Sequence, residues 1–300
     1  MKPWIMLVCL LVVSSGGIAR DNLQVSNNIM TMRVDGEITL GQNGGVLDYR
    51  ITTPIKPEMQ KLLDKAVRNW TFHPVIVDGK PVIAKNNMRI TLAAREAGRG
   101  YAVSVDNVTF RGMSPESPGG QGKPSAEQGG SVVITARSMK PGGYPSGMAR
   151  AGVEGAVLLY VRVSPNGNTE DVIAVQSSLY NVRGRPDVLD KARKLLEENA
   201  IAAAKRWEFN VTVTKPDPTP ADMTVTVPYG YVMGHNANRE DAGQWRVELR
   251  SERAVVPWLL DTRTDTRTAQ DIGVSDLDSD DVMPLASALR APDGVIGKTL

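Results

Sequence analysis

Few residues in this sequence have types and spacing suited to chemistry. The chain carries two histidines, His73 and His235, and a single cysteine, Cys9. A zinc site takes about four converging His, Cys or acidic ligands, and isolated histidines do not supply them. His73 stands between Phe72 and Pro74, where a structural role is the favoured interpretation. We therefore expect no metal site, no cofactor and no catalytic residue.

Two further motifs fail on inspection. GVIGKT, residues 294–299, resembles the end of a phosphate-binding loop, but the first glycine of that motif would fall on Pro292. The G-x-S-x-G turn that presents a catalytic serine is absent from the sequence. The net charge is +2 and no basic run appears, so we expect no nucleic-acid partner. The composition indicates a protein that is not an enzyme.

The most distinctive pattern is W-x-F, which occurs twice. Trp70 and Phe72 form the first copy, and Trp207 and Phe209 form the second, in a chain with only 5 Trp and 3 Phe. Each copy follows an amphipathic helical stripe and is in phase with its apolar face. A tryptophan in such a place most often buries about 200 Å² in the core, so core positions are favoured over ligand stacking. The repetition indicates a duplicated unit.

The elements around the two triplets follow one order: strand, turn, strand, helix, W-x-F, strand. The first unit spans 33–110 and the second spans 141–234. In the second unit Gly155 opens an alternating strand, and Asn166-Gly167 is a strong hairpin signal. We predict an α+β fold of two small modules, each with a short antiparallel sheet packed on one main helix.

The segments outside these units differ in composition. Residues 1–19 combine Lys2, an apolar run and small residues before Arg20, which predicts a cleaved signal peptide. A retained membrane anchor is the alternative, although the run is short of the about 20 residues of a span. Residues 111–140 are rich in Gly and Pro and predict a flexible linker. Residues 235–300 predict a disordered acidic tail. Within it, VVPWLL, residues 255–260, is interpreted as an apolar spot in a loose tail, and docking on a domain or binding a partner are the alternatives.

The second unit resembles the C-terminal domain of the TonB family of energy transducers. The resemblance rests on YPSGMARAGVEGAVLLYVRVSPNGNTEDVIAVQSS, followed by VLDKA and KRWEF. The matching positions are Tyr144, Pro145, Gly152, Glu154, Gly155, Gly167, Ser177, Leu189, Asp190, Trp207 and Phe209. The proline that the family has two residues after the phenylalanine is replaced by Val211, whereas Pro74 is present in the first unit. The first unit matches more weakly, as a degenerate copy.

The resemblance implies a way of binding. In the family, an exposed sheet edge pairs with a short extended segment of an outer-membrane receptor through backbone hydrogen bonds. The closing strand MTVTV is where this edge is expected, which makes Thr224, Val225, Thr226 and Val227 candidate partner-binding residues. Tyr144 and Pro145 either clamp the preceding segment onto the sheet or contact the partner.

The function implied is that of a non-enzymatic periplasmic binding protein in envelope transport. Its partner is expected to be an outer-membrane receptor, another envelope protein or a second copy of the chain. The family's Ser/His membrane signature and long Pro-rich spacer are missing, so the fold carries over more directly than energy coupling. Two alternatives stay open: an energy transducer anchored in the inner membrane, and a structural scaffold of the cell envelope.

Overall fold

The structure is a computed structural model that describes most of the chain. The described residues are 28–77, 79–111, 132–214, 216–233, 242–260, 272–278, 281–285 and 291–300. The expected signal peptide at 1–19, the central part of the expected linker at 112–131, and His235 lie outside them. The described residues form a strand-rich α+β fold, as expected. Among them, no helix combines the length and apolar character required to cross a bilayer.

The first unit is a sheet with one main helix on it. Its elements are β1 (Asn28–Leu40), β2 (Val46–Ile51), α1 (Pro57–Val67), β3 (Val75–Val77), β4 (Lys80–Val82), β5 (Ala84–Ala97) and β6 (Gly100–Arg111). β1 pairs with β2 and β5, and β5 pairs with β6, all antiparallel. α1 begins at Pro57. The N–H groups of a first helical turn have no acceptor within the helix, so the N–H that proline lacks costs nothing there. It buries Leu63 and Val67 against the sheet.

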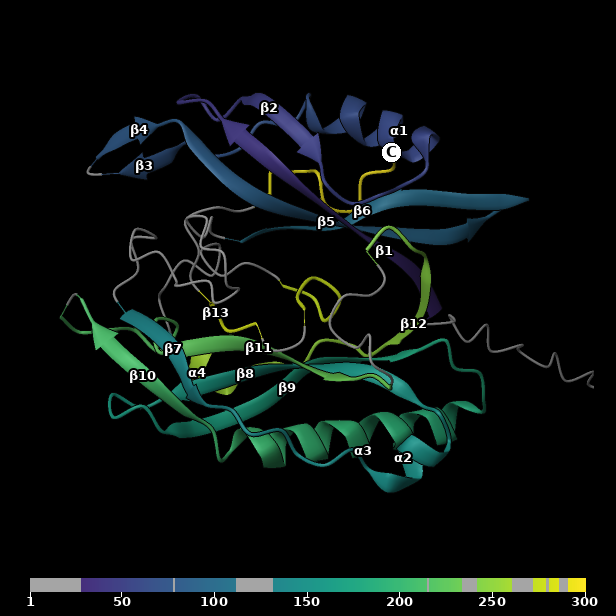
Figure 1. Ribbon diagram of the computed structural model, residues 1–300, viewed down its shortest axis with the longest axis vertical. Coiled ribbons are helices and arrows are strands. Elements are labelled where there is room, and N and C mark those ends of the chain that lie inside the picture. Colours follow the sequence, from purple (N-terminus) through teal and green to yellow (C-terminus); the bar gives the residue numbers. More distant parts are fainter. Residues whose placement is uncertain are drawn as a thin grey trace, which may run out of the picture.

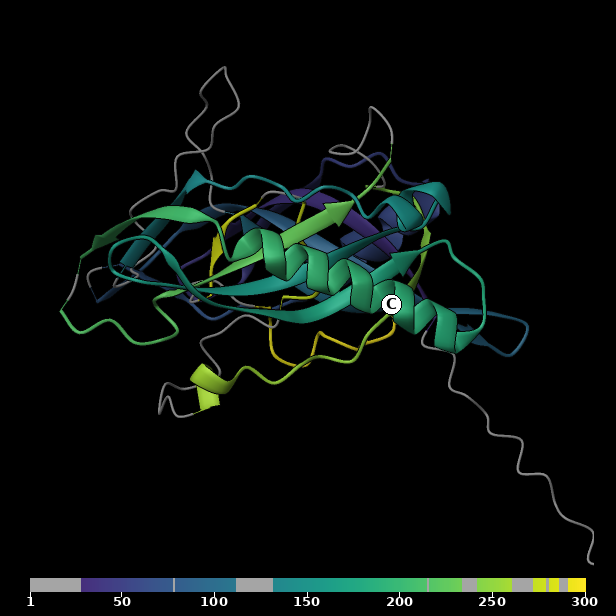
Figure 2. The same cartoon turned by 90° about the horizontal axis from the view of Figure 1, so that it is seen from below.

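The second unit is also a sheet with one main helix on it. Its elements are β7 (Val132–Ser138), α2 (Ser146–Arg150), β8 (Glu154–Val163), β9 (Thr169–Tyr180), α3 (Pro186–Ala204), β10 (Glu208–Val213) and β11 (Thr224–Tyr231). β8 pairs with β9 on one side and β11 on the other. α3 also begins at a proline and lies along the sheet, as Figure 2 shows. β7 and β10 form a separate two-stranded ribbon, so 132–138 is a strand where a flexible linker was expected.

A turn glycine touches the W-x-F phenylalanine in both units. Gly167 has φ +84°, and a Cβ there would lie 2.0 Å from the carbonyl oxygen of Phe209. Gly44 has φ +80°, and a Cβ there would lie 1.9 Å from the carbonyl oxygen of Phe72. The amide of Phe209 donates to Gly167 O at 2.7 Å, and that of Phe72 donates to Gly44 O at 2.9 Å. Each triplet therefore joins its hairpin turn to the end of its helix.

The four aromatic side chains of the triplets are buried in the cores of their units. Trp70 and Phe72 lie in one core, and Trp207 and Phe209 lie in the other. The indole of Trp207 donates to the carbonyl of Lys140 at 3.1 Å. Gly155 lies so close to β9 that a Cβ would meet the carbonyl oxygen of Ser178 at 2.3 Å. These contacts are packing contacts within the chain.

The two units share one sheet. In the part of the chain that the structure describes, nine strands join it in the order β13-β11-β8-β9-β12-β1-β5-β6, with β2 paired to β1. β12 (Arg246–Arg250) lies between β9 and β1 and links the two halves, at the right of Figure 1. The halves face each other, and α1 and α3 cover their outer faces (Figure 1). The sheet is therefore continuous, where two separate module sheets were expected.

The C-terminal region is built into this fold. It contributes β12, α4 (Pro257–Leu260) and β13 (Met283–Pro284), and residues 272–278 lie between the two half-sheets (Figure 1). Ile272, Val274 and Leu277 join the apolar cluster on the inner face of β8 and β9. The described parts of 235–300 are therefore ordered, where disorder was expected. The physical reason is that the acidic residues of this region meet buried arginines of the first unit, which composition alone does not reveal.

Candidate functional site: the outer edge of strand β11

The predicted partner-binding strand lies between two neighbours. β11 pairs with β8 from Thr224 to Tyr231, and its other edge carries β13, with Val225 opposite Pro284 and Thr226 opposite Met283. The side chains of residues 224–227 are buried, so a partner could reach this strand only through its backbone edge. The structure thus brings the four predicted strand residues to one sheet position, and it places a strand of the same chain beside them.

The direction of the backbone groups along β11 decides which residues could bind a partner. Val163 donates to the carbonyl of Met223 at 2.8 Å, and Leu285 donates to the carbonyl of Thr224 at 3.2 Å. The backbone polar groups of successive residues in a strand point to opposite sides. Odd-numbered residues of β11 therefore face β8, while Thr224, Thr226, Pro228 and Gly230 face the outer edge. Val225 and Val227 contribute no backbone hydrogen bond to that edge.

The other two predicted partner residues lie at the far end of the second unit. The hydroxyl of Tyr144 donates to the carbonyl of Val153 at 2.5 Å, and its ring packs edge-on against Tyr231 with centroids 5.4 Å apart. Burial and the nearby carboxylate of Glu154 raise the pKa of this hydroxyl. Pro145 begins α2, and its carbonyl accepts from Met148 and Ala149. These contacts hold Tyr144 beside the Tyr231 end of β11, away from the part of its edge that pairs with β13.

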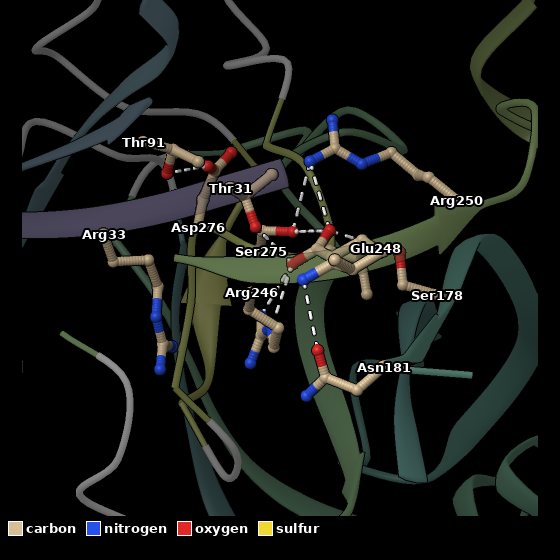
Figure 3. A network of polar contacts seen from close by, with 12 residues as sticks. Thr31, Arg33, Thr91, Ser178, Asn181, Arg246, Glu248, Arg250, Ser275 and Asp276 are labelled. Atoms are coloured by element: carbon tan, nitrogen blue, oxygen red, sulfur yellow. Dashed lines mark hydrogen bonds and ion pairs between the residues drawn. The ribbon is translucent and has the colours of Figure 1, made fainter. Parts of the chain in front are cut away.

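A buried charge network lies on β12, where the two half-sheets meet (Figure 3). Glu248 on β12 is fully buried and accepts hydrogen bonds from Thr31 of β1 at 2.7 Å and from Ser275 at 2.6 Å. Arg246 and Arg250 also bind it, at 2.7 and 3.3 Å. Burial by itself would raise the pKa of Glu248, but the two arginines and the Ser275 hydroxyl outweigh it and lower the pKa.

A second group of charges, built around the buried Arg89, ties the C-terminal segment to the first unit. Arg89 on β5 makes a two-pronged ion pair with Asp35, with the closest atoms 2.6 Å apart, and binds Asp278 at 2.9 Å. Burial lowers the pKa of a guanidinium, but these two carboxylates raise that of Arg89 above its ordinary value. Asp278 also binds Arg33 at 3.1 Å. The ion pairs of Asp278 with Arg33 and Arg89 thus fix the position of residues 276–278 against β1 and β5.

Asp276 differs from these residues because the direct partners of its carboxylate are neutral. It accepts from Thr91 and Asn107 at 2.5 Å each and from the amide of Gly273 at 2.6 Å. Burial raises the pKa of this carboxyl, and the hydrogen bonds only partly oppose the rise. Its role is to join the C-terminal segment to β5 and β6.

Sequence reasoning missed these residues. The one signal for them was Arg246-x-Glu248-x-Arg250, in which charges recur with the period of a strand. The same pattern is common on solvated strands, so only the tertiary contacts distinguish a buried charge network from a solvated strand.

The other residues that the sequence suggested for chemistry make only structural contacts. His73 is exposed and lies 3.4 Å from Asp293. Gly297, within GVIGKT, donates to the carbonyl of Val105 at 2.7 Å, so this segment lies on the edge of β6. Within the described residues no cluster of His, Cys, Asp and Glu could hold a metal.

Comparisons with known proteins find relatives for part of the chain. It is 36% identical over 100 residues to the protein TonB of Xanthomonas campestris pv. campestris strain B100, and it matches the TonB protein of a second strain equally well. The match covers 33% of this chain and 39% of the relative, so the chain spans less than half the length of the curated relatives it matches. No family model and no solved structure matches. These findings support a TonB-like C-terminal domain within the chain.

Proposed function

We propose that this chain is a non-enzymatic binding protein of the cell envelope that acts in TonB-type transport. Its partner is an extended segment of an outer-membrane receptor or of another envelope protein, which adds as a strand to the outer edge of β11. The observation that carries the proposal is the edge itself, because the outward groups of Thr224 and Thr226 lie opposite a strand from elsewhere in the chain. The likeness to TonB over a third of the chain points the same way.

The two units are proposed to be copies of one module. In each, a proline begins the main helix, a turn glycine at φ near +80° packs on the W-x-F phenylalanine, and the chain then returns to pair with the first strand. In the first unit, the strand that corresponds to β11 is β5. Its outer edge is covered along eleven residue pairs by β6. Under this proposal the first copy has lost its binding edge and the second has kept it.

The test is capture of an identified outer-membrane receptor from envelope extract, with substitutions chosen from the direction of the backbone. Thr226→Pro removes an outward N–H and is expected to abolish capture. The matched control Thr226→Val retains the N–H with a side chain of similar shape and is expected to capture normally. Val225→Pro is unsuited to this purpose, since its N–H faces β8 and the substitution would damage the fold. Equal capture by the Thr226→Pro and Thr226→Val proteins would exclude strand addition at this edge.

The periplasmic location is part of the proposal, with signal cleavage before Arg20. Mass spectrometry of the mature N-terminus tests it directly. A chain that starts at Arg20 supports the periplasmic protein, whereas a chain that retains residues 1–19 favours the anchored transducer. A concentration-dependent dimer with no receptor capture would favour the scaffold.

A further inference from the structure

Both ends of the described nine-stranded sheet are covered by the last twenty residues of the sequence. At one end, β13 and Leu285 pair with β11. At the other, Lys298 accepts from the amide of Val105 at 3.0 Å, and Leu300 donates to the carbonyl of Val103 at 2.9 Å. Exposed edges invite pairing with other strands, and natural sheets commonly cover them. The cover on β11 is relevant to function, because it occupies the edge proposed for the partner.

The cover on β11, residues 281–285, is called here the edge strap. Its strand part is two residues long, whereas β8 pairs with β11 along eight residues. Leu285 is its buried anchor and joins the apolar cluster on the inner face of the sheet, with Met283 packed beside it. Val282 packs on the opposite face, against the α3 core. The strap is thus attached mainly by side chains and only briefly by the backbone.

Pro284 gives the strap an asymmetric edge. Leu285 donates toward β11, so the backbone of Met283 points toward β11 as well and that of Pro284 points away. At Pro284 the outward N–H that a further strand would need does not exist. The strap therefore covers the β11 edge at residues 224–226, and at Pro284 its own outer side offers no N–H to a further strand, as a resident cover requires.

We propose that the edge strap is the resident occupant of the β11 binding edge and that a partner strand must displace it. The inference rests on the proposed function and adds a regulatory step and a partner chemistry to it. The partner is an extended segment with two apolar side chains two residues apart, which take the places of Met283 and Leu285 on the inner apolar cluster. Backbone pairing is supplied by Thr224 and Thr226 in either case.

The neighbourhood of Leu285 supplies the pocket for the second apolar side chain. Trp258 of α4 packs against the same cluster, and its indole donates to the hydroxyl of Thr224 at 3.1 Å. The guanidinium of Arg162 lies 5.6 Å from the ring centroid of Trp258. This contact holds the indole of Trp258 as an apolar wall beside Thr224. The wall is the same whether the strap or a partner strand lies on the edge.

The test uses a fluorescently labelled synthetic peptide with the sequence of residues 279–288 as the probe strand. Leu285→Asp in the full chain places a charge in the apolar cluster and releases the strap. The probe is expected to bind this variant tighter than wild type by about tenfold or more, since the loss of one buried leucine shifts strap closure by at least that much. A probe that carries the Leu285→Asp change itself is the matched control and is expected not to bind. Equal binding of the probe to both proteins, or binding to neither, would overturn the proposal.

A locked variant keeps the test valid if the released variant folds poorly. Thr226→Cys with Met283→Cys, in a Cys9→Ser background, joins the strap to β11 through a disulfide. Residues paired across antiparallel strands have Cα atoms about 5.5 Å apart, within the range that a disulfide spans. The oxidised protein is expected to bind the probe at least about tenfold more weakly than its reduced form, because only the reduced strap can leave the edge. Binding that is the same in both redox states would refute displacement.

The same proteins separate this inference from the proposed function. If the probe binds as expected but no receptor is captured by the released variant, the strap inference stands and the receptor proposal fails. If receptor capture is equal for the oxidised lock and the wild type, the partner uses another surface and the strap inference fails.

Discussion

Substitution of Gly167 by alanine is the sharpest test of how the W-x-F triplet is held. Gly167 has φ +84°, and its amide and carbonyl lie in the hairpin turn between β8 and β9. A Cβ added there would be 2.0 Å from the carbonyl oxygen of Phe209, whereas an ordinary contact begins near 3.4 Å. The carbonyl must therefore retreat by more than an ångström, and it belongs to a fully buried residue of the core.

The magnitude follows from three costs. A left-handed alanine costs about 1–2 kcal/mol. Loss of the 2.7 Å hydrogen bond from Phe209 to Gly167 costs about 1 kcal/mol more. Displacement of Phe209 disturbs close packing, at about 1–2 kcal/mol. We expect Gly167→Ala to lower the free energy of unfolding by about 3–5 kcal/mol in total.

The matched control is Gly152→Ala. Gly152 has φ +64° but no atom within 4 Å of an added Cβ, so it keeps the conformational cost and lacks the clash. We expect a loss of about 1–2 kcal/mol there. Gly44→Ala should resemble Gly167→Ala, because its Cβ would meet Phe72 at 1.9 Å. The measurement is urea unfolding followed by tryptophan fluorescence and circular dichroism. If Gly167→Ala and Gly152→Ala lower the free energy of unfolding equally, then Gly167 does not approach the carbonyl of Phe209 as closely as described.

Three further predictions concern the C-terminal region and are checked by urea unfolding as a function of pH. Glu248→Gln should lower the unfolding free energy by about 3–5 kcal/mol near neutral pH, because the buried Arg246 and Arg250 lose the charge of Glu248, although Arg250 keeps its ion pair with Asp106. Since the pKa of Glu248 is lowered from 4.5, its contribution is present above that pH and lost as pH falls through the folded pKa, so the difference between variant and wild type should shrink in acid. A gap that stayed constant down to pH about 2 would contradict this assignment. Asp276→Asn should change stability at neutral pH by less than about 1 kcal/mol or increase it, because an amide can serve Thr91, Asn107 and the amide of Gly273 without a buried charge. The pKa of Asp276 is raised, so its contribution is lost as pH rises through the folded pKa, and wild type should weaken relative to Asp276→Asn over that rise. A large loss at neutral pH in Asp276→Asn would show that the charge itself is required. Trp258→Phe keeps an aromatic ring, although a smaller one than the indole, and loses the hydrogen bond to Thr224. We expect a loss of at least about 1 kcal/mol, and a loss no larger than the scatter of the measurement would show that this bond contributes nothing.

The local elements could be predicted because their causes are local. An apolar stripe with helical spacing leads into each triplet, one up to Trp70 and the other up to Trp207. The structure has the helices α1 and α3 at these stripes. The hairpin at Asn166-Gly167 follows from glycine's access to positive φ, and Gly167 adopts it. The exclusion of a phosphate loop at GVIGKT followed from one residue, Pro292.

The candidate site could be predicted only in part. The sequence indicated the strand MTVTV, and the structure has β11 from Thr224 to Tyr231. Which of its backbone groups face outward depends on the register with β8, and that register is set by pairing between residues more than sixty positions apart. The strap on the edge was not foreseen, because Met283 and Pro284 carry no strand pattern of their own.

By itself, the sequence determined the helices, the hairpin turns and the aromatic anchors, since these depend on neighbours a few residues away. Only the tertiary structure decided the place of the described residues between 242 and 300. Arg33 and Arg89 stand in the first unit and Asp278 near the end of the chain, and each group read alone resembles a solvated charge. Together they form ion pairs, in which the desolvation of the two buried arginines is offset by the Asp278 carboxylate. That pairing places 272–278 between the half-sheets and brings the edge strap to β11.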